Sequence, residues 1–185
     1  ALRMARLFTG SRESIVLNGA YHGHTAALIE ISPYKFDGPG GAGAPEYVHV
    51  IPMPDPYRGR FRGNDQETST QYAGLIQDAI ENIKNNGKQV ALFIAEAIMG
   101  CGGQVIFPQS FLQQAFELLK KASGICIADE VQIGFGRVGT HFWGFETCGA
   151  IPDIVTVGKS MGNGHPLSAV ITRKEIANAF DNGME

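Results

Sequence analysis

The chain has little of what would tie it to a membrane, a nucleic acid or a disulfide scaffold. No apolar run approaches the roughly 20 residues that cross a bilayer, and the first residues contain no apolar signal core. A net charge of −3 provides no basic surface for nucleic acid or anionic lipid. The three cysteines are an odd number without metal-ligand spacing, so free thiols in a reducing compartment are expected. We therefore predict a cytoplasmic location, or the mitochondrial matrix if a presequence lies upstream.

What is present is a chain rich in apolar residues and glycine, in a pattern typical of α/β proteins. The 185 residues are 44% hydrophobic, which is enough for one substantial core. Short apolar segments predict strands at 14–17, 47–51, 90–95, 125–128, 154–157 and 169–172. Amphipathic spacing predicts helices at 1–8, 26–31, 69–84, 111–119 and 173–180. This alternation predicts a three-layer α/β fold, with a mostly parallel sheet between flanking helices.

The connections between these elements carry expectations of their own. Residues 32–46 and 52–67 are predicted to be irregular, because proline, glycine and polar residues interrupt both stretches. Gly10 is expected to end the first helix, and Ser110 and Thr172 are expected to cap the helices that follow them. Only 11 residues separate Val157 from Ala169, too few for a helical crossover. The strands on either side of this connection are therefore predicted to be antiparallel neighbours.

Two charged residues stand at the ends of apolar strands. Asp129 follows Ile-Cys-Ile-Ala, and Lys159 follows Ile-Val-Thr-Val-Gly. Their ordinary interpretations are a helix-capping acid and a surface lysine. However, ligands of α/β proteins bind at the carboxyl ends of strands, where a buried carboxylate requires a positive partner and a desolvated lysine becomes nucleophilic. A lysine that forms a Schiff base and a carboxylate that keeps a pyridine nitrogen protonated are what pyridoxal phosphate (PLP) requires.

The motifs around these two residues resemble the class III aminotransferase family, over essentially the whole chain. They are Ala-Asp-Glu-Val-Gln-Ile-Gly-Phe-Gly-Arg at 128–137 and Gly-Lys-Ser-Met-Gly-Asn-Gly at 158–164. Segments at 21–24, 31–35, 56–59, 101–104 and 162–166 are similar to one subgroup, the alanine–glyoxylate aminotransferase 2-like proteins. That subgroup includes phospho-lyases that act on phosphoethanolamine or phosphohydroxylysine.

The resemblance implies fold type I of the PLP-dependent enzymes, with residues 1–185 as the central part of the PLP-binding large domain. The family holds the cofactor phosphate on a Ser-Gly-Ser/Thr-Glu-Ala-Asn turn before a helix, and that turn is absent here. The C-terminal small domain is absent as well. We therefore expect a domain that is incomplete at both ends, and an isolated chain that holds PLP poorly.

The resemblance also assigns roles to residues of the motifs. Lys159 forms the Schiff base, and Asp129 pairs with the pyridine nitrogen. Val131 packs on one face of the cofactor ring, and Tyr21 stacks on the other. Gln132 donates a hydrogen bond to the phenolic oxygen of the cofactor.

Three more residues are assigned to the cofactor pocket. Gly23 lets the backbone approach closely, and His22 is counted with it. Glu96, which follows the strand at 90–95, lies beside the cofactor, although the proline that usually follows it is Ala97 here. His22 and His24 are too close in sequence for a convincing metal pair, so we expect no metal site.

Other polar residues keep two interpretations. Glu130 is as consistent with helix capping or a solvated sheet edge as with catalysis. Arg137 is most simply a structural arginine paired with an acid, with substrate binding as the alternative. Arg58 and Arg60 are either solvated loop charges or ligands of a substrate phosphate or carboxylate. His165 is a candidate for the mouth of the pocket.

We therefore predict a PLP-dependent aminotransferase that moves an amino group from a primary amine or amino acid to a keto acid or aldehyde. Lys159 would act as the general base at the carbon next to the substrate nitrogen. The first alternative is a PLP-dependent phospho-lyase that eliminates phosphate and ammonia from a phosphorylated amine such as phosphoethanolamine. The second is a catalytically inactive fragment or scaffold. The resemblance also implies a homodimer with the active site at its interface, and we expect neither nucleic acid nor membrane as a partner.

Overall fold

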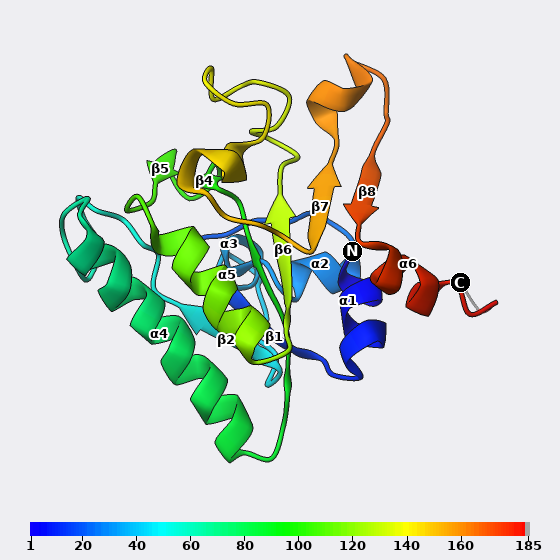
Figure 1. The fold of residues 1–185 in the computed structure, drawn as a ribbon, viewed down its shortest axis with the longest axis horizontal. Helices are drawn as coiled ribbons and strands as arrows, with labels where there is room; N and C mark the ends of the chain where they lie inside the picture. The colour runs from blue at the N-terminus through cyan, green and yellow to red at the C-terminus, as the bar shows by residue number, and fades with distance from the viewer. Residues whose placement is uncertain (184–185) are drawn as a thin grey trace.

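A six-stranded sheet runs through the centre of the molecule (Figure 1). The computed structural model describes residues 1–183. Across the sheet the strands lie in the order β2 (Val48–Ile51), β1 (Glu13–Leu17), β3 (Val90–Ala95), β6 (Ile125–Asp129), β7 (Ile154–Val157) and β8 (Ala169–Thr172). All neighbouring pairs are parallel except β7 and β8, which are antiparallel. The predicted mostly parallel sheet and the predicted antiparallel pair around Lys159 are confirmed.

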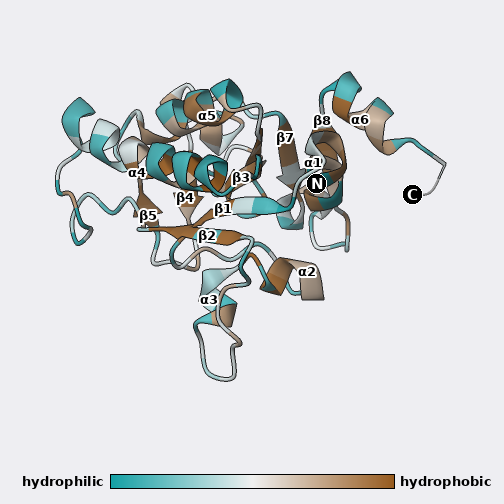
Figure 2. Ribbon diagram, turned by 90° about the horizontal axis from the view of Figure 1, so that it is seen from below, coloured by the Kyte–Doolittle hydropathy of each residue, from teal (hydrophilic) through white to brown (hydrophobic). Residues whose placement is uncertain are grey.

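Helices cover both faces of this sheet and make it the middle of three layers. On one face lie α4 (Gln66–Asn85) and α5 (Phe111–Lys121). On the other lie α1 (Leu2–Thr9), α2 (Ala26–Ile29), α3 (Pro33–Phe36) and α6 (Lys174–Phe180). Figure 2 shows α4 and α5 on one side of the sheet and α2 and α3 on the opposite side. The predicted three-layer α/β architecture is therefore confirmed.

Two hydrophobic cores fill the spaces between the layers, because successive side chains of a strand point to opposite faces. Ile15 and Leu17 of β1 belong to the core under α4 and α5, whereas Val16 between them belongs to the core under α1. In β3, Phe93 and Leu92 divide in the same way. Every residue of β3 and β6 is buried, which explains why these strands read as continuous apolar runs.

The ends of two helices follow from local hydrogen bonding. Gly10 ends α1 with a left-handed φ of 68°, as predicted. Helix α4 begins at residue 66, three residues before the predicted start, because the Asp65 carboxylate accepts the Thr68 N–H at 2.8 Å. This carboxylate satisfies one of the amide groups that the first turn of a helix leaves unpaired.

Ser110 is the N-cap residue of α5 as predicted, although its hydroxyl makes no capping bond, and the prediction that Thr172 caps α6 is wrong. Ser110 occupies the N-cap position of α5, but its hydroxyl donates to Oε1 of Gln66 at 2.7 Å instead of capping the helix. Arg173, not Thr172, occupies the N-cap position of α6, and the Thr172 hydroxyl donates to the Asp153 carbonyl at 3.0 Å. In both cases a partner from a distant element replaces the local amide.

Short elements were not predicted in four places. Helix α3 lies within the stretch 32–46 that was predicted to be irregular. A separate hairpin is formed by β4 (Ile98–Met99) and β5 (Val105–Ile106). Two 3₁₀ helices, η1 (Gly144–Cys148) and η2 (Lys159–Gly162), follow β6 and β7.

The parallel strands all end at one edge of the sheet, where their connections gather. In Figure 1 the arrows of β6 and β7 both point to this edge. Glu96 follows β3, Asp129 is the last residue of β6, and Lys159 lies two residues beyond β7. Among residues 1–183, no helix is both long and apolar enough to cross a bilayer.

Candidate active site

Asp129 is buried at this edge, and both of its carboxylate oxygens have hydrogen-bond partners. Its side chain is 8% exposed. Oδ2 lies 2.8 Å from Nδ1 of His22. Oδ1 accepts the Val131 N–H at 3.2 Å and lies 3.4 Å from the Thr156 hydroxyl, which donates to it. These contacts hold the carboxylate in one orientation and keep a negative charge in a largely dry site.

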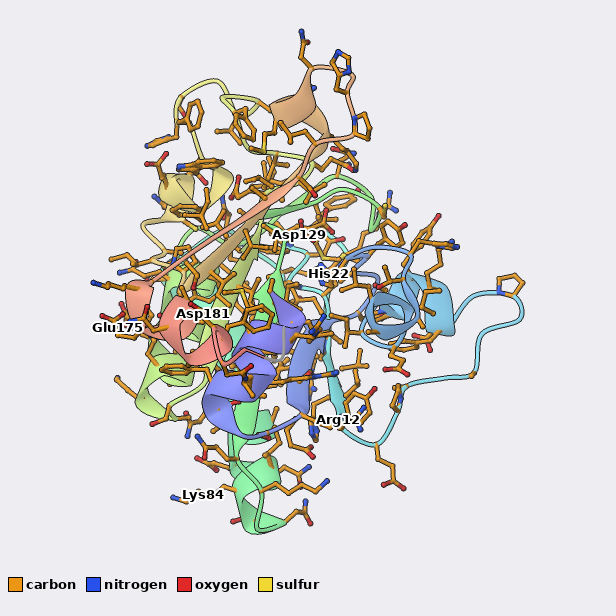
Figure 3. The ribbon with its side chains drawn as sticks, turned by 90° about the vertical axis from the view of Figure 1, so that its right-hand side faces the viewer. Arg12, His22, Lys84, Asp129, Glu175 and Asp181 are labelled. Atoms are coloured by element: carbon orange, nitrogen blue, oxygen red, sulfur yellow. The ribbon has the colours of Figure 1, made fainter. Side chains whose placement is uncertain are left out.

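His22 reaches Asp129 from the loop that follows β1, and Figure 3 shows the two side chains next to each other. Its side chain is fully buried. The His22 N–H donates to the Ser32 hydroxyl at 3.0 Å, and that hydroxyl donates to the Leu28 carbonyl at 2.6 Å. Because a carboxylate can only accept, Nδ1 carries the proton of the bond to Asp129. The other ring nitrogen, Nε2, is buried and has no hydrogen-bond partner among residues 1–183.

Lys159 is the first residue of η2, and its amine donates to Oε1 of Gln132 at 2.9 Å. Its backbone has a φ of 44°, in the left-handed region that non-glycine residues rarely occupy. Its side chain is exposed, so the expectation of a desolvated lysine is wrong for this chain. The reason is its place in the fold, since the residue lies beyond the end of β7, where no described element covers it.

Glu96 is the second buried carboxyl group of the site, with 5% of its surface exposed. Its Oε2 accepts the Gly100 N–H at 3.0 Å, whereas Oε1 is buried without a partner among the described residues. Burial raises the pKa of Glu96 above its ordinary value, and the nearby charge of Asp129 acts in the same direction. The Gly100 N–H, His22 and Lys159 oppose this rise without cancelling it.

Gly100 brings Glu96 and Gln132 together because it has no side chain. A β-carbon at Gly100 would lie 2.2 Å from Nε2 of Gln132 and 3.1 Å from Oε2 of Glu96. The amide that holds Lys159 and the carboxyl group of Glu96 therefore pack against the same glycine.

Tyr21 lies in the loop after β1, and Val131 lies two residues beyond the end of β6. The Tyr21 ring meets the Tyr34 ring edge to face at 5.9 Å, and Nζ of Lys35 lies 5.7 Å from its centroid. Val131 packs beside the residue before Lys159, because a β-carbon at Gly158 would lie 3.5 Å from its Cγ1. Both side chains are half-buried, so each keeps exposed surface that a ligand can cover.

Gly23 is required for a reason that the sequence did not indicate. Its φ is 136°, and a β-carbon there would lie 2.5 Å from Cδ1 of Leu28. A side chain at this position would therefore displace Leu28, whose carbonyl holds the hydroxyl group under His22. The absence of a side chain at Gly23 therefore allows the backbone to pack closely against Leu28.

The residues with two interpretations resolve differently. Glu130 is 1% exposed and accepts the N–H groups of Gly144 and Phe145 at 2.8 and 2.9 Å, so it caps η1. Arg137 donates from Nε to the Ser160 hydroxyl at 2.9 Å, and the expectation of an acidic partner is wrong. Arg58, Arg60 and His165, the remaining candidates for substrate or pocket contacts, are exposed.

The sequence interpretation missed Thr156 and Ser32, whose hydroxyl groups support Asp129 and His22. The signal for Thr156 was a lone hydroxyl in the apolar run Ile-Val-Thr-Val. The pairing of β6 with β7 places Thr156 directly opposite Asp129. Ser32 carried no signal, because its contact depends on how the loop after β1 folds back.

The side chains gathered at this edge fit one class of ligand. An accessible amine at Lys159 suits an aldehyde, and the buried carboxylate of Asp129 suits a cationic ring nitrogen. The half-buried Tyr21 and Val131 offer apolar surface to a flat ring. PLP has the aldehyde, the nitrogen and the ring. The fold and the site thus define the class of α/β proteins that use PLP.

Comparison with known proteins narrows this class to one family. The chain belongs to the class III aminotransferase family, whose sequence model, described as "Aminotransferase class-III", matches residues 1–185. It is 50% identical over 183 residues to "Alanine--glyoxylate aminotransferase 2-like" of Drosophila melanogaster, which covers 97% of this chain and 37% of that protein. It is 43% identical over 191 residues to "Ethanolamine-phosphate phospho-lyase homolog 1" of Caenorhabditis elegans, with 97% and 41% covered. The predicted family is confirmed, and the chain spans about two fifths of the length of these relatives.

Solved structures agree with this assignment. A phospholyase from Arthrobacter in complex with phosphoethanolamine has a TM-score of 0.87 and 30% identity, over 98% of this chain and 42% of that one. An amine transaminase from an uncultivated Pseudomonas species in its PLP-bound form has a TM-score of 0.87 and 26% identity, over 100% of this chain and 43% of that one.

Proposed function

We propose that the protein containing this chain is a PLP-dependent aminotransferase that moves an amino group from a primary amine or amino acid to a keto acid or aldehyde. The observation that carries the proposal is the pair of neighbouring strands that present Asp129, with both oxygens bonded, and Lys159, with an accessible amine. Membership of the class III aminotransferase family supports it. A transaminase of similar fold is known in a PLP-bound form, which supports PLP as the cofactor.

We assign the cofactor contacts to residues of this edge. When bound, PLP supplies an aldehyde that condenses with primary amines and a protonated ring that accepts an electron pair. Lys159 would hold the aldehyde carbon, and Asp129 would hold the proton on the ring nitrogen. Tyr21 and Val131 would pack on the ring faces, and Gln132 would bind the phenolic oxygen. The remaining pocket residues are His22, Gly23 and Glu96.

Lys159 then moves the proton on which the reaction depends. Once its amine is free, it takes the proton from the substrate carbon next to the nitrogen, as a general base within hydrogen-bond reach. The bond from Nζ to Oε1 of Gln132 restricts where the amine can lie before this step. His22, Val131 and Thr156 all donate to the side chain of Asp129 and fix its orientation.

We further propose that residues 1–185 form the central part of the PLP-binding large domain, and that the phosphate-binding turn and the small domain belong to other parts of the full protein. The share of its relatives that this chain spans, 37% and 41% of their lengths, supports the proposal. A homodimer with the active site at the interface follows from the family resemblance. For its location we propose the cytoplasm or the mitochondrial matrix; the human relative "Alanine--glyoxylate aminotransferase 2, mitochondrial" supports the second.

A phospho-lyase is the second candidate, because two relatives point to it by name. One is the homolog from Caenorhabditis elegans, and the other is the Arthrobacter phospholyase with phosphoethanolamine. Elimination of phosphate and ammonia would use the same Lys159 and Asp129, since both reactions begin with removal of the same proton.

The test uses the full-length protein with PLP and two substrate sets. Amino transfer from an amino acid to a keto acid or aldehyde is the expected activity. Stoichiometric release of phosphate and ammonia from phosphoethanolamine, without an amino acceptor, would establish the phospho-lyase instead. Lys159→Ala should abolish either activity, whereas Lys174→Ala, at an exposed lysine of α6, should not. A protein without cofactor absorbance, in which Lys159→Ala changes nothing, would be a scaffold.

A further inference from the structure

Two buried polar atoms at the site lack hydrogen-bond partners. Four side-chain nitrogen and oxygen atoms in residues 1–183 are buried and unpartnered: two belong to Arg6, and the others are Nε2 of His22 and Oε1 of Glu96. A buried polar atom without a partner is costly, so such atoms are normally paired. The last two lie at the same edge of the sheet.

The strand order places Glu96 along the path from His22 to Asp129. His22 follows β1 and Asp129 ends β6, and β3 lies between these two strands. To reach Asp129, the His22 ring must cross the end of β3, where Glu96 is the next residue. Ala95 of β3 pairs with Ala128 of β6, so Glu96 and Asp129 stand at the same level of the sheet. The unpartnered atoms therefore belong to groups at the same edge of the sheet, with no direct hydrogen bond between them.

In each side chain, the atom that is already hydrogen-bonded determines whether the unpartnered atom can donate or accept. Nδ1 of His22 donates to Asp129, so Nε2 of the neutral ring is an acceptor that needs a donor. Oε2 of Glu96 already accepts the Gly100 N–H, so Oε1 is free to carry a proton. A protonated Glu96 supplies the donor that His22 lacks.

Burial favours the neutral form of Glu96, whereas the charges around it act in both directions: Asp129 raises its pKa, and His22 and Lys159 lower it. His22 faces it from the loop after β1, Asp129 from β6 and Lys159 from beyond β7. Lys159 is exposed and already bonded to Gln132, and Glu130 is bonded to the backbone of η1. Burial and the charge of Asp129 both raise the pKa of Glu96. A second carboxylate beside Asp129 would be a buried charge without a partner.

We propose that Glu96 is a neutral carboxylic acid that donates its Oε1 proton, through one bound water, to Nε2 of His22. The three side chains then form one chain of hydrogen bonds, from Glu96 through His22 to Asp129, with a single negative charge on Asp129. Glu96 and His22 are positioning residues that hold this charge in place. Its effect on PLP rests on the proposed function, whereas the chain of bonds does not.

Variants of Glu96 in the full-length protein test whether this side chain carries a proton and donates it. An amide at Glu96→Gln donates to His22 as the acid does, and its oxygen still accepts the Gly100 N–H. We expect this variant to keep the dissociation constant for PLP, and the pH midpoint of the cofactor's visible band, within about twofold and a few tenths of a pH unit of the wild type. Glu96→Ala removes the donor, and the dissociation constant should rise about tenfold, the effect of one hydrogen bond. Glu46→Gln, at an exposed glutamate, is the matched control.

A double-mutant cycle tests whether Glu96 and His22 act through the same chain of hydrogen bonds. His22→Ala should weaken PLP binding at least as much as Glu96→Ala, and the double variant should be no worse than His22→Ala alone, because both break one chain. Equal losses in Glu96→Gln and Glu96→Ala would show an ionised Glu96 and overturn the proposal. Additive losses, or no loss in either Glu96 variant, would overturn it as well.

The cofactor-free protein separates this proposal from the proposed function. Without cofactor, Glu96→Gln should unfold at the same urea concentration as the wild type. Glu96→Ala and His22→Ala should each unfold at a lower urea concentration, and the double variant should lose less stability than the sum of the two single losses. The infrared band of a protonated carboxylic acid should be present near pH 7 and absent from Glu96→Gln. A wild type without a PLP band would refute the proposed function only. An intact PLP band without the acid band would refute the proton on Glu96.

Discussion

Replacing Gly100 with alanine tests how tightly the site is packed. A β-carbon at Gly100 would lie 2.2 Å from Nε2 of Gln132, 2.9 Å from its Cδ and 3.1 Å from Oε2 of Glu96. The backbone of Gly100 is outside the left-handed region, so alanine adds no backbone strain there. The whole effect of the substitution therefore comes from displaced side chains.

The structure sets the size of this effect. The Gln132 amide must move by about 1 Å to restore an ordinary contact, and this movement breaks its bond to Lys159. A hydrogen bond to a charged group contributes about 1.5–3 kcal/mol, and the exposure of Lys159 favours the low end. Overpacking adds about 1–3 kcal/mol. We expect the free energy of unfolding to fall by about 2.5–4.5 kcal/mol.

Urea unfolding of the cofactor-free, full-length protein measures this loss. The control is Gly74→Ala in α4, where a β-carbon meets nothing within 4 Å. That substitution should raise the free energy of unfolding by about 0.5–1 kcal/mol, because alanine favours a helix over glycine. If Gly100→Ala unfolds at the same urea concentration as the wild type, the contact among Gly100, Gln132 and Glu96 is not as close as described.

Three more changes have expected outcomes. Glu130→Gln should lower the free energy of unfolding by about 1–3 kcal/mol, because one of two backbone amides loses its acceptor; wild-type stability in urea would contradict the capping role. Asp129→Asn should raise the dissociation constant for PLP about tenfold or more, since an amide cannot stabilise a cationic ring nitrogen as a carboxylate does; unchanged titration of the visible band would contradict the assignment. Although burial raises the pKa of Glu13, hydrogen bonds from Lys88 and His49 hold it below its ordinary value. Its stabilising contribution is therefore present above about pH 4.3 and is lost as pH falls through the folded pKa, so Glu13→Gln should flatten the acid-side decline in the free energy of unfolding.

The strands of the sheet were predictable because their signal is local. Each central strand is a short apolar run between turn residues, and the short connection around Lys159 permitted only an antiparallel pair. The hairpin of β4 and β5 escaped prediction, because strands of two residues are too short to show a period. The hydroxyl groups of Ser110 and Thr172 make no capping bonds for a different reason. Gln66 and Asp153, distant in the chain, offer acceptors that compete with the local amides.

The sequence by itself determined that Asp129 and Lys159 stand at strand ends, together with the motifs that mark the class III aminotransferase family, because both depend on neighbours along the chain. Only the tertiary structure determined which side chains hydrogen-bond to these two residues. The bond between His22 and Asp129 joins residues 107 positions apart, and it exists because β1 and β6 lie on either side of β3. Strand order is set by packing between distant segments, which no local pattern encodes. The pairing of Glu130 with η1, and the position of Glu96 beneath the path of His22, are decided in the same way.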